Sequence, residues 1–121
     1  MNDNEKLQHE TLDSVREYLN KLIDGIDACS NNLQINKNDE GIKLLGEIID
    51  GLDWLLNALR LTKAAQKNSV DTTEIEEQIR ILLEAMENGD IILVSDLLQY
   101  EIKPILEKWR IVLADIFRVN N

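Results

Sequence analysis

The sequence has few of the residues that break or cross-link a chain. Its 121 residues include one cysteine, one proline and five glycines, and only 4% are aromatic. So little glycine and proline argues against a fold of many short strands joined by tight turns. The single cysteine, Cys29, cannot form an internal disulfide, and together with the one histidine, His9, it cannot complete a structural zinc site. A chain without disulfides suits a reducing compartment, and we expect a cytoplasmic protein.

Membranes and nucleic acids are not expected partners. No apolar run approaches the ~20 residues of a membrane-spanning helix, and residues 1–10 are polar and acidic, unlike a signal peptide. The net charge of −10 repels both nucleic-acid phosphates and anionic lipids. No glycine-rich phosphate loop is present. We therefore expect no cofactor, and a partner that is another protein or a second copy of this chain.

Leucine and isoleucine at helical spacing are abundant. Hydrophobic residues make up 44% of the chain, enough for a buried core. Apolar residues recur in steps of three and four over residues 4–30, 40–67, 73–88 and 90–119, which predicts four helices. The inner faces predicted for the first three are Leu12, Val15, Leu19, Leu22, Ile26 and Cys29; Ile42, Leu45, Ile49, Leu52, Leu56 and Leu59; and Ile75, Ile79, Leu82 and Met86. The polar residues 31–40 predict the longest loop, with Leu33 and Ile35 packed against the core.

Short polar residues mark the predicted starts of the second and third helices. Asp39 is the expected cap of the second helix. For the third helix, Thr73 and Glu76 form a capping-box pattern, and Asp71 with Glu74 offers the same chemistry. Both possibilities place the start of the third helix close to residue 73.

The last helix is predicted to be apolar on two opposite faces. Gly89 suits the left-handed position after a helix and Asp90 can cap the next one, so the third and fourth helices should form an antiparallel hairpin. The first face is Ile91, Val94, Leu98, Ile102, Ile105, Trp109, Val112 and Ile116, and the second is Leu93, Leu97, Tyr100, Pro104 and Ile111. At 100° per residue these faces point in roughly opposite directions. A helix with two apolar faces needs neighbours on both sides, so the second face is the predicted contact surface.

Pro104 lies inside this last helix. A proline there removes the hydrogen bond to the carbonyl of Tyr100 and clashes with it. A new helix starting at Pro104 would need Lys103 as its cap, and lysine is a poor cap. The first apolar face also keeps its phase across the proline. We therefore predict one long helix that is kinked at Pro104 and curves around the core.

Trp54 and Leu61 fall outside the predicted inner face of the second helix. A tryptophan in that position can lie flat on the protein's own surface, or it can contact another chain. Both interpretations stay open, and the second adds Trp54 to the candidate contact surface.

Four acidic residues form a pattern with possible chemistry. Glu74-x-x-Glu77 followed by Glu87-x-x-Asp90 resembles the metal-binding pattern of the all-α nucleotide pyrophosphohydrolases, although the two pairs lie closer together here than in that family. The resemblance implies four carboxylates on facing helices that hold magnesium and, through it, a nucleoside triphosphate. A magnesium-dependent pyrophosphohydrolase is therefore one alternative function.

A second resemblance covers residues 87–109. This segment contains an Asn-Gly-Asp turn at 88–90, then Asp-Leu-Leu-x-Tyr-Glu at 96–101, then Pro104 and Trp109. It is similar to a pattern in small uncharacterised helical proteins of Gram-positive bacteria, which implies no activity. Tyr100, Pro104 and Trp109 can be packing residues, or Asp96, Tyr100 and Glu101 can shape a recognition surface.

These observations predict an all-α protein, an antiparallel four-helix bundle that forms a single domain over residues 1–121. No nucleophile and base are placed together, so we expect a non-enzymatic protein–protein interaction module that forms a homodimer. The expected interface residues are Trp54, Leu93, Leu97, Tyr100 and Ile111. A helical chaperone for a flagellar or secreted partner is a further alternative.

Overall fold

The computed structural model describes residues 2–114, and within them every regular element is helical. The order of elements is α1 (Asp3–Gln34), α2 (Asn38–Leu61), the short 3-10 helix η1 (Lys63–Ala65), α3 (Thr73–Glu87), α4 (Ile91–Leu97), the π-helical turn η2 (Leu98–Ile102) and α5 (Lys103–Leu113). The segments α4, η2 and α5 follow one another without a break and form the predicted last helix. The predicted extension of that helix to residue 119, with Ile116 on its first face, lies outside the described residues.

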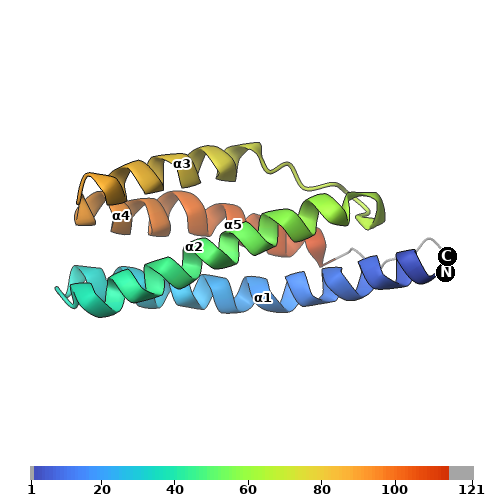
Figure 1. Cartoon of the computed structure of the whole chain (residues 1–121), viewed down its shortest axis with the longest axis horizontal. Helices are drawn as coiled ribbons and strands as arrows, with labels where there is room; N and C mark the ends of the chain where they lie inside the picture. The colour runs from blue at the N-terminus through green and yellow to red at the C-terminus, as the bar shows by residue number, and fades with distance from the viewer. Residues whose placement is uncertain (1, 115–121) are drawn as a thin grey trace.

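The described residues form an antiparallel helical bundle, as the sequence predicted. Each long helix runs opposite to the one before it, and α2 crosses the bundle obliquely (Figure 1). Helix α1 packs against α2 and also against α4, η2 and α5, while α3 packs on α4 and η2. No helix among the described residues has a stretch long and apolar enough to cross a membrane.

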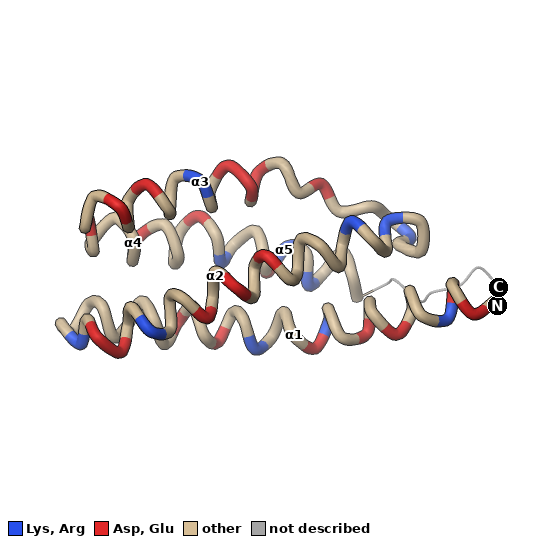
Figure 2. The backbone as a smooth tube through the Cα atoms, viewed as in Figure 1, with Lys and Arg blue, Asp and Glu red and all other residues tan. Residues whose placement is uncertain are grey.

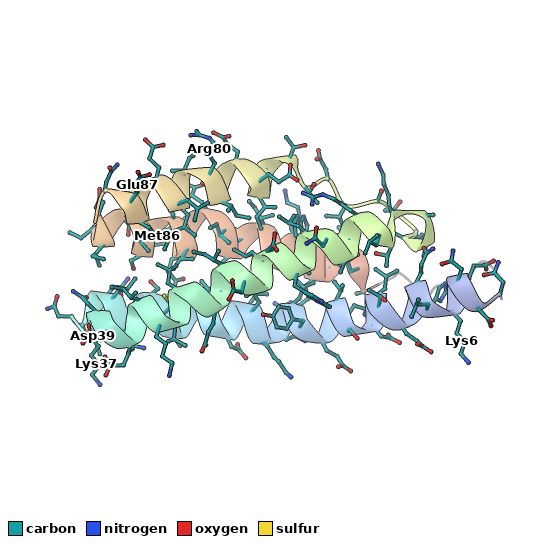
Figure 3. All side chains as sticks on the ribbon, in the orientation of Figure 1. Lys6, Lys37, Asp39, Arg80, Met86 and Glu87 are labelled. Atoms are coloured by element: carbon teal, nitrogen blue, oxygen red, sulfur yellow. The ribbon has the colours of Figure 1, made fainter. Side chains whose placement is uncertain are left out.

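The predicted inner faces account for most of the core. All six residues of the α1 face are buried, and they are joined by Ile23, Ser30 and Leu33. On α3, Ile75 and Leu82 are buried, while Ile79 and Met86 are partly buried. Figure 3 shows Met86 on the inner side of α3, with Arg80 and Glu87 on its outer side.

Ile42 was wrongly assigned to the core, since 51% of its surface is exposed. The residue that faces α1 at this level is Gly41, which is buried. A Cβ atom on Gly41 would lie 2.6 Å from Cδ2 of Leu33, so only glycine lets the two helices approach this closely. The neighbouring Ile42 therefore turns towards solvent.

The first connection is much shorter than predicted. Helix α1 continues to Gln34 and α2 begins at Asn38, so residues 31–34 are helical rather than part of a loop. Leu33 extends the buried face of α1, as expected, but Ile35 is exposed and does not pack on the core. Asp39 is not the cap of α2, because it lies within the first turn of that helix. Asn36, with a φ of 64°, makes the tight reversal.

The second connection, residues 62–72, is organised by a buried glutamine. The amide nitrogen of Gln66 donates to the carbonyl of Leu59 (2.8 Å) and to the Thr62 hydroxyl (3.3 Å), and its oxygen accepts from the Val70 amide (3.0 Å). Because a buried side-chain amide is costly unless it is paired, these bonds fix the path of the loop. The predicted second helix therefore ends at Leu61 and not at residue 67.

The start of α3 is held by a side chain two residues before it. Oδ1 of Asp71 accepts from the Thr73 amide at 3.0 Å, and this bond lowers the pKa of Asp71. The Thr73–Glu76 capping box is not formed, since Thr73 is already the first helical residue. At the other end, Gly89 has a φ of +67° and Asp90 accepts from the Leu93 amide, both as predicted.

The predicted distortion of the last helix lies one turn before Pro104. In η2 the Lys103 amide donates to the carbonyl of Leu98, five residues back, in place of the usual four. This wider turn gives the proline ring room beside the Tyr100 carbonyl. The chain stays helical throughout, so the last helix is one long helix, as predicted, and its irregular turn lies directly before Lys103 and Pro104.

Two glycines of α2 allow a matched test of the close α1–α2 contact. A Cβ on Gly46 would meet nothing within 4 Å. We expect Gly46→Ala to raise the free energy of unfolding by about 0.5–1 kcal/mol through helix propensity. Gly41→Ala should lower it by about 1–3 kcal/mol, because Leu33 must be displaced. Urea denaturation of both variants checks this, and equal effects would contradict the close contact.

Candidate interaction surface

The last helix is fastened to α1 through its π-helical turn. Nζ of Lys103 lies 2.7 Å from Oδ1 of Asp27, and the side-chain amide of Gln99 donates to the same oxygen at 3.1 Å. Farther along, Arg110 donates to Oδ1 of Asn20 at 3.2 Å. The hydrogen bond from Lys103 is the main reason that the pKa of Asp27 lies below its ordinary value, and partial burial opposes it. These polar contacts fix which side of the last helix faces α1.

A buried hydroxyl pair joins α1 to α4. The hydroxyl oxygens of Ser30 and Ser95 are 2.7 Å apart, and both side chains are buried. The amide nitrogen of Gln34 lies 3.4 Å from the Ser95 hydroxyl and covers the pair. Each hydroxyl therefore has a partner inside an otherwise leucine-rich contact.

The opposite side of the last helix carries an exposed apolar stripe. We use the term outer stripe for Ile92, Tyr100, Pro104 and Ile111. The side chains of Ile92, Tyr100 and Ile111 are 77%, 70% and 75% exposed, and Pro104 is also exposed. Such a row on a single helix is unusual for a surface that meets only water.

The π-helical turn brings the ends of the outer stripe into line. Ile92 and Ile111 are separated by 19 positions (111 − 92), which in a regular α-helix would leave them about 100° apart. A π-helical turn accommodates roughly one extra residue. When that extra residue is subtracted, the positions that still separate Ile92 from Ile111 correspond to about five complete turns of 3.6 residues. Both isoleucines therefore point to the same side.

The structure divides the predicted second face into two parts. Tyr100, Pro104 and Ile111 belong to the outer stripe, and Leu93 lies at its edge with less exposure. Leu97 was wrongly assigned to this face, because it is buried in the core. Asp96 and Glu101 are exposed, and Asp96 lies beside the outer stripe, but a role of either residue in recognition stays a prediction.

Trp54 lies on a different surface from the outer stripe. Its ring packs edge to face with Tyr18 of α1, with ring centroids 5.3 Å apart and planes at 75°. The groove beside this pair is lined by residues of α1 and α2 alone. Trp54 therefore packs on its own chain and is not part of the outer stripe, while 43% of the residue stays exposed and open to another molecule.

The four acidic residues of the pyrophosphohydrolase pattern are not brought together. Glu74 and Glu77 begin α3, whereas Glu87 ends it, about 15–20 Å away along the helix axis. Glu77 is paired with Arg80 at 2.6 Å, which lowers the pKa of Glu77, and Asp90 caps α4. In the part of the chain that the structure describes, no three acidic, histidine or cysteine side chains are grouped to hold a metal ion.

Cys29 is a core residue, as expected. Its thiol lies 3.2 Å from the carbonyl oxygen of Gly41 and is fully buried. Burial raises the pKa of the thiol to about 11. Cys29 is therefore held in its protonated form, which is the unreactive one.

Ile92 was assigned to neither face from the sequence, although it is the most exposed apolar residue of residues 91–114. The helical projection assumed a constant 100° per residue, and the π-helical turn breaks that assumption. Proline at position 104 was the available signal, since a wide turn is one way for a helix to tolerate a proline. The contact between Asp27 and Lys103 was also missed, because it joins residues that are far apart in the sequence.

One comparison with known proteins gives a match. The family described as a domain of unknown function (DUF8042) matches residues 10–112, which cover every helix described above except the first turns of α1 and the end of α5. This chain belongs to the DUF8042 family. No curated protein and no solved structure matches it. The family assignment of the DUF8042 chain carries no activity, so its function has to be argued from its surfaces.

The Asp27–Lys103 contact should make the free energy of unfolding depend on pH in the acidic range. A lowered folded pKa means that Asp27 contributes stability above its unfolded pKa of about 3.9, and that this contribution is lost as the pH falls through the folded pKa. We expect Asp27→Asn to cost less than about 1 kcal/mol at pH 7, because the pair is partly exposed, and to cost less at pH 2 than at pH 7. Urea denaturation at both pH values measures this. Asp24→Asn, an exposed carboxylate on the same helix, is the control and should change little.

The buried thiol gives a kinetic prediction. At pH 8, a thiol reagent such as 5,5′-dithiobis(2-nitrobenzoate) should modify Cys29 of the folded protein only as fast as the helices around it unfold. In 8 M urea, where the chain is unfolded, the same reagent should modify Cys29 at once. Rapid modification of the folded protein would contradict the burial of Cys29.

Proposed function

We propose that the DUF8042 chain is a non-enzymatic protein–protein interaction module, one helical-bundle domain that forms a homodimer through its outer stripe. The observation that carries this proposal is the row of three large apolar side chains, each more than two thirds exposed, on a helix whose other side is buried. Burying each such side chain is worth about 1.5–3 kcal/mol. The stripe is therefore a source of association energy that the folded monomer leaves unused.

The order of residues along the outer stripe favours a second copy as the partner. We consider two antiparallel copies of the last helix related by a two-fold axis at the level of Ile102. In this arrangement Ile92 of one copy faces Ile111 of the other, and Tyr100 faces Pro104. The same axis places the exposed carboxylate of Asp96 opposite the ammonium of Lys108. An isologous interface needs such self-complementarity, because each residue meets a different residue of an identical chain.

We place this activity in the cytoplasm. The support is chemical: Cys29 is a free, buried thiol, and the fold of residues 2–114 uses no disulfide. Reducing compartments are where chains of this kind are usually found.

Charge introduced into the outer stripe should produce a folded monomer. We expect the Tyr100→Glu/Ile111→Glu double variant to keep its helical circular dichroism and to sediment at half the mass of the native protein. Leu97 is not a suitable site, because Leu97→Glu would bury a charge in the core. Leu61→Glu, at an apolar side chain 78% exposed near the end of α2, is the matched control and should stay dimeric.

The Asp96–Lys108 contact can be tested by charge exchange. Asp96→Lys alone should weaken association, and Asp96→Lys with Lys108→Asp should restore it. Native protein that sediments as a monomer at high concentration would contradict the homodimer. The outer stripe would then be free for a different protein, such as the flagellar or secreted partner that this chain would hold as a chaperone.

A further inference from the structure

A second surface feature lies on the other side of α1. A groove of about 470 Å³ runs between α1 and α2. Its lining includes the aromatic pair Tyr18 and Trp54. Asp27, which binds the last helix, lies nine residues beyond Tyr18, on the opposite side of α1. The groove is therefore separate from the outer stripe, and a ligand bound in it does not require the proposed homodimer.

The aromatic pair is built into the groove by a glycine. A Cβ atom on Gly51 would overlap the Tyr18 hydroxyl, so the tip of the tyrosine ring reaches the α2 backbone this closely because residue 51 has no side chain. Tyr18 in turn holds the Trp54 ring in an edge-to-face contact, which is a favoured aromatic arrangement. The indole is fixed in position and is still partly open to the groove.

The charge around this fixed indole is mostly negative. Glu17, Glu47 and Asp50 line the groove, and Lys21 is the one basic residue among them. Within residues 2–114, none of these three carboxylates has a lysine or arginine within ion-pair distance. Acidic residues are spread along α1 and α2, with few lysines or arginines between them (Figure 2). The groove thus offers an aromatic face beside unneutralised negative charge.

We infer that this groove docks an arginine-bearing basic segment of a partner protein. A guanidinium can stack on the Trp54 ring and donate hydrogen bonds to the carboxylates of Glu47 and Asp50, which lie about two turns and one turn before Trp54 on α2. Arginine fits better than lysine, because its planar group stacks and forms two parallel hydrogen bonds to a carboxylate. The same groove of a second copy is the wrong occupant, because its lining carries three carboxylates and one lysine and would place like charges together.

The test uses the full-length protein labelled with ¹⁵N and a blocked peptide, Gly-Ser-Arg-Gly-Arg-Ser-Gly. The chain has two tryptophans, so its spectrum has two indole N–H signals, and the buried Trp109 serves as an internal reference. We expect the peptide to move the Trp54 signal in a saturable way and to leave that of Trp109 unchanged. The same peptide with citrulline in place of arginine, which keeps the shape and removes the charge, should bind roughly tenfold more weakly or not at all.

Two double variants of α2 separate a built site from general attraction to an acidic protein. Glu47→Gln/Asp50→Asn should weaken peptide binding by roughly tenfold, whereas Asp39→Asn/Glu40→Gln, which removes the same charge at the far end of α2, should change it less than about twofold. Asp39 lies at the α1–α2 turn (Figure 3), and the groove lining on α2 begins at Glu47, about two turns farther along the helix. No shift at Trp54, equal binding of the citrulline peptide, or equal loss in both variants would each overturn the inference.

Discussion

Helix α1 buries one unbroken row of side chains from Leu12 to Leu33, and the bundle is assembled around that row. Helix α2 packs on one flank and the last helix on the other, while α3 reaches the bundle through α4 and η2. Two close approaches set the geometry of α1 and α2: Leu33 over Gly41, and Tyr18 over Gly51. Because glycine occupies both positions, the two helices lie near enough to bury α1 on this side. The groove beside Trp54 is a consequence of the same approach.

The fold class was predictable because helical periodicity is a property of each segment by itself. The α1 face, most of the α2 face and the Gly89–Asp90 junction were all predicted correctly. The errors arose where a neighbouring element decided the outcome. Gly41, and not Ile42, faces α1, because Leu33 leaves no room for a side chain there. Helix α2 ends earlier than predicted because the side chain of Gln66 forms a hydrogen bond with the carbonyl of Leu59. Neither effect has a signature in the periodic pattern.

The candidate surface was predictable in part. Tyr100 and Ile111 were expected to be exposed, and they are. Leu97 was predicted on the second face and is buried, whereas Ile92, which was assigned to neither face, is exposed. A helix with one π-helical turn does not keep a constant angle per residue. Trp54 was grouped with the last helix on the ground that it lay outside the α2 core, but which neighbour it meets depends on how α1 and α2 pack. The two surfaces differ in chemistry as well: the outer stripe is apolar, whereas the Trp54 groove combines an aromatic ring with carboxylates.

The Ser30–Ser95 pair has a consequence for how uniquely this bundle folds. Rows of leucine and isoleucine can slide past each other by one turn and still bury similar area, so apolar packing alone specifies axial position weakly. The two hydroxyls satisfy each other in one alignment of α1 and α4. A slip of one turn would leave each of them buried against hydrocarbon with no acceptor, at a cost of about 1–3 kcal/mol per group. Two small polar side chains thus select a single register from several that would otherwise compete.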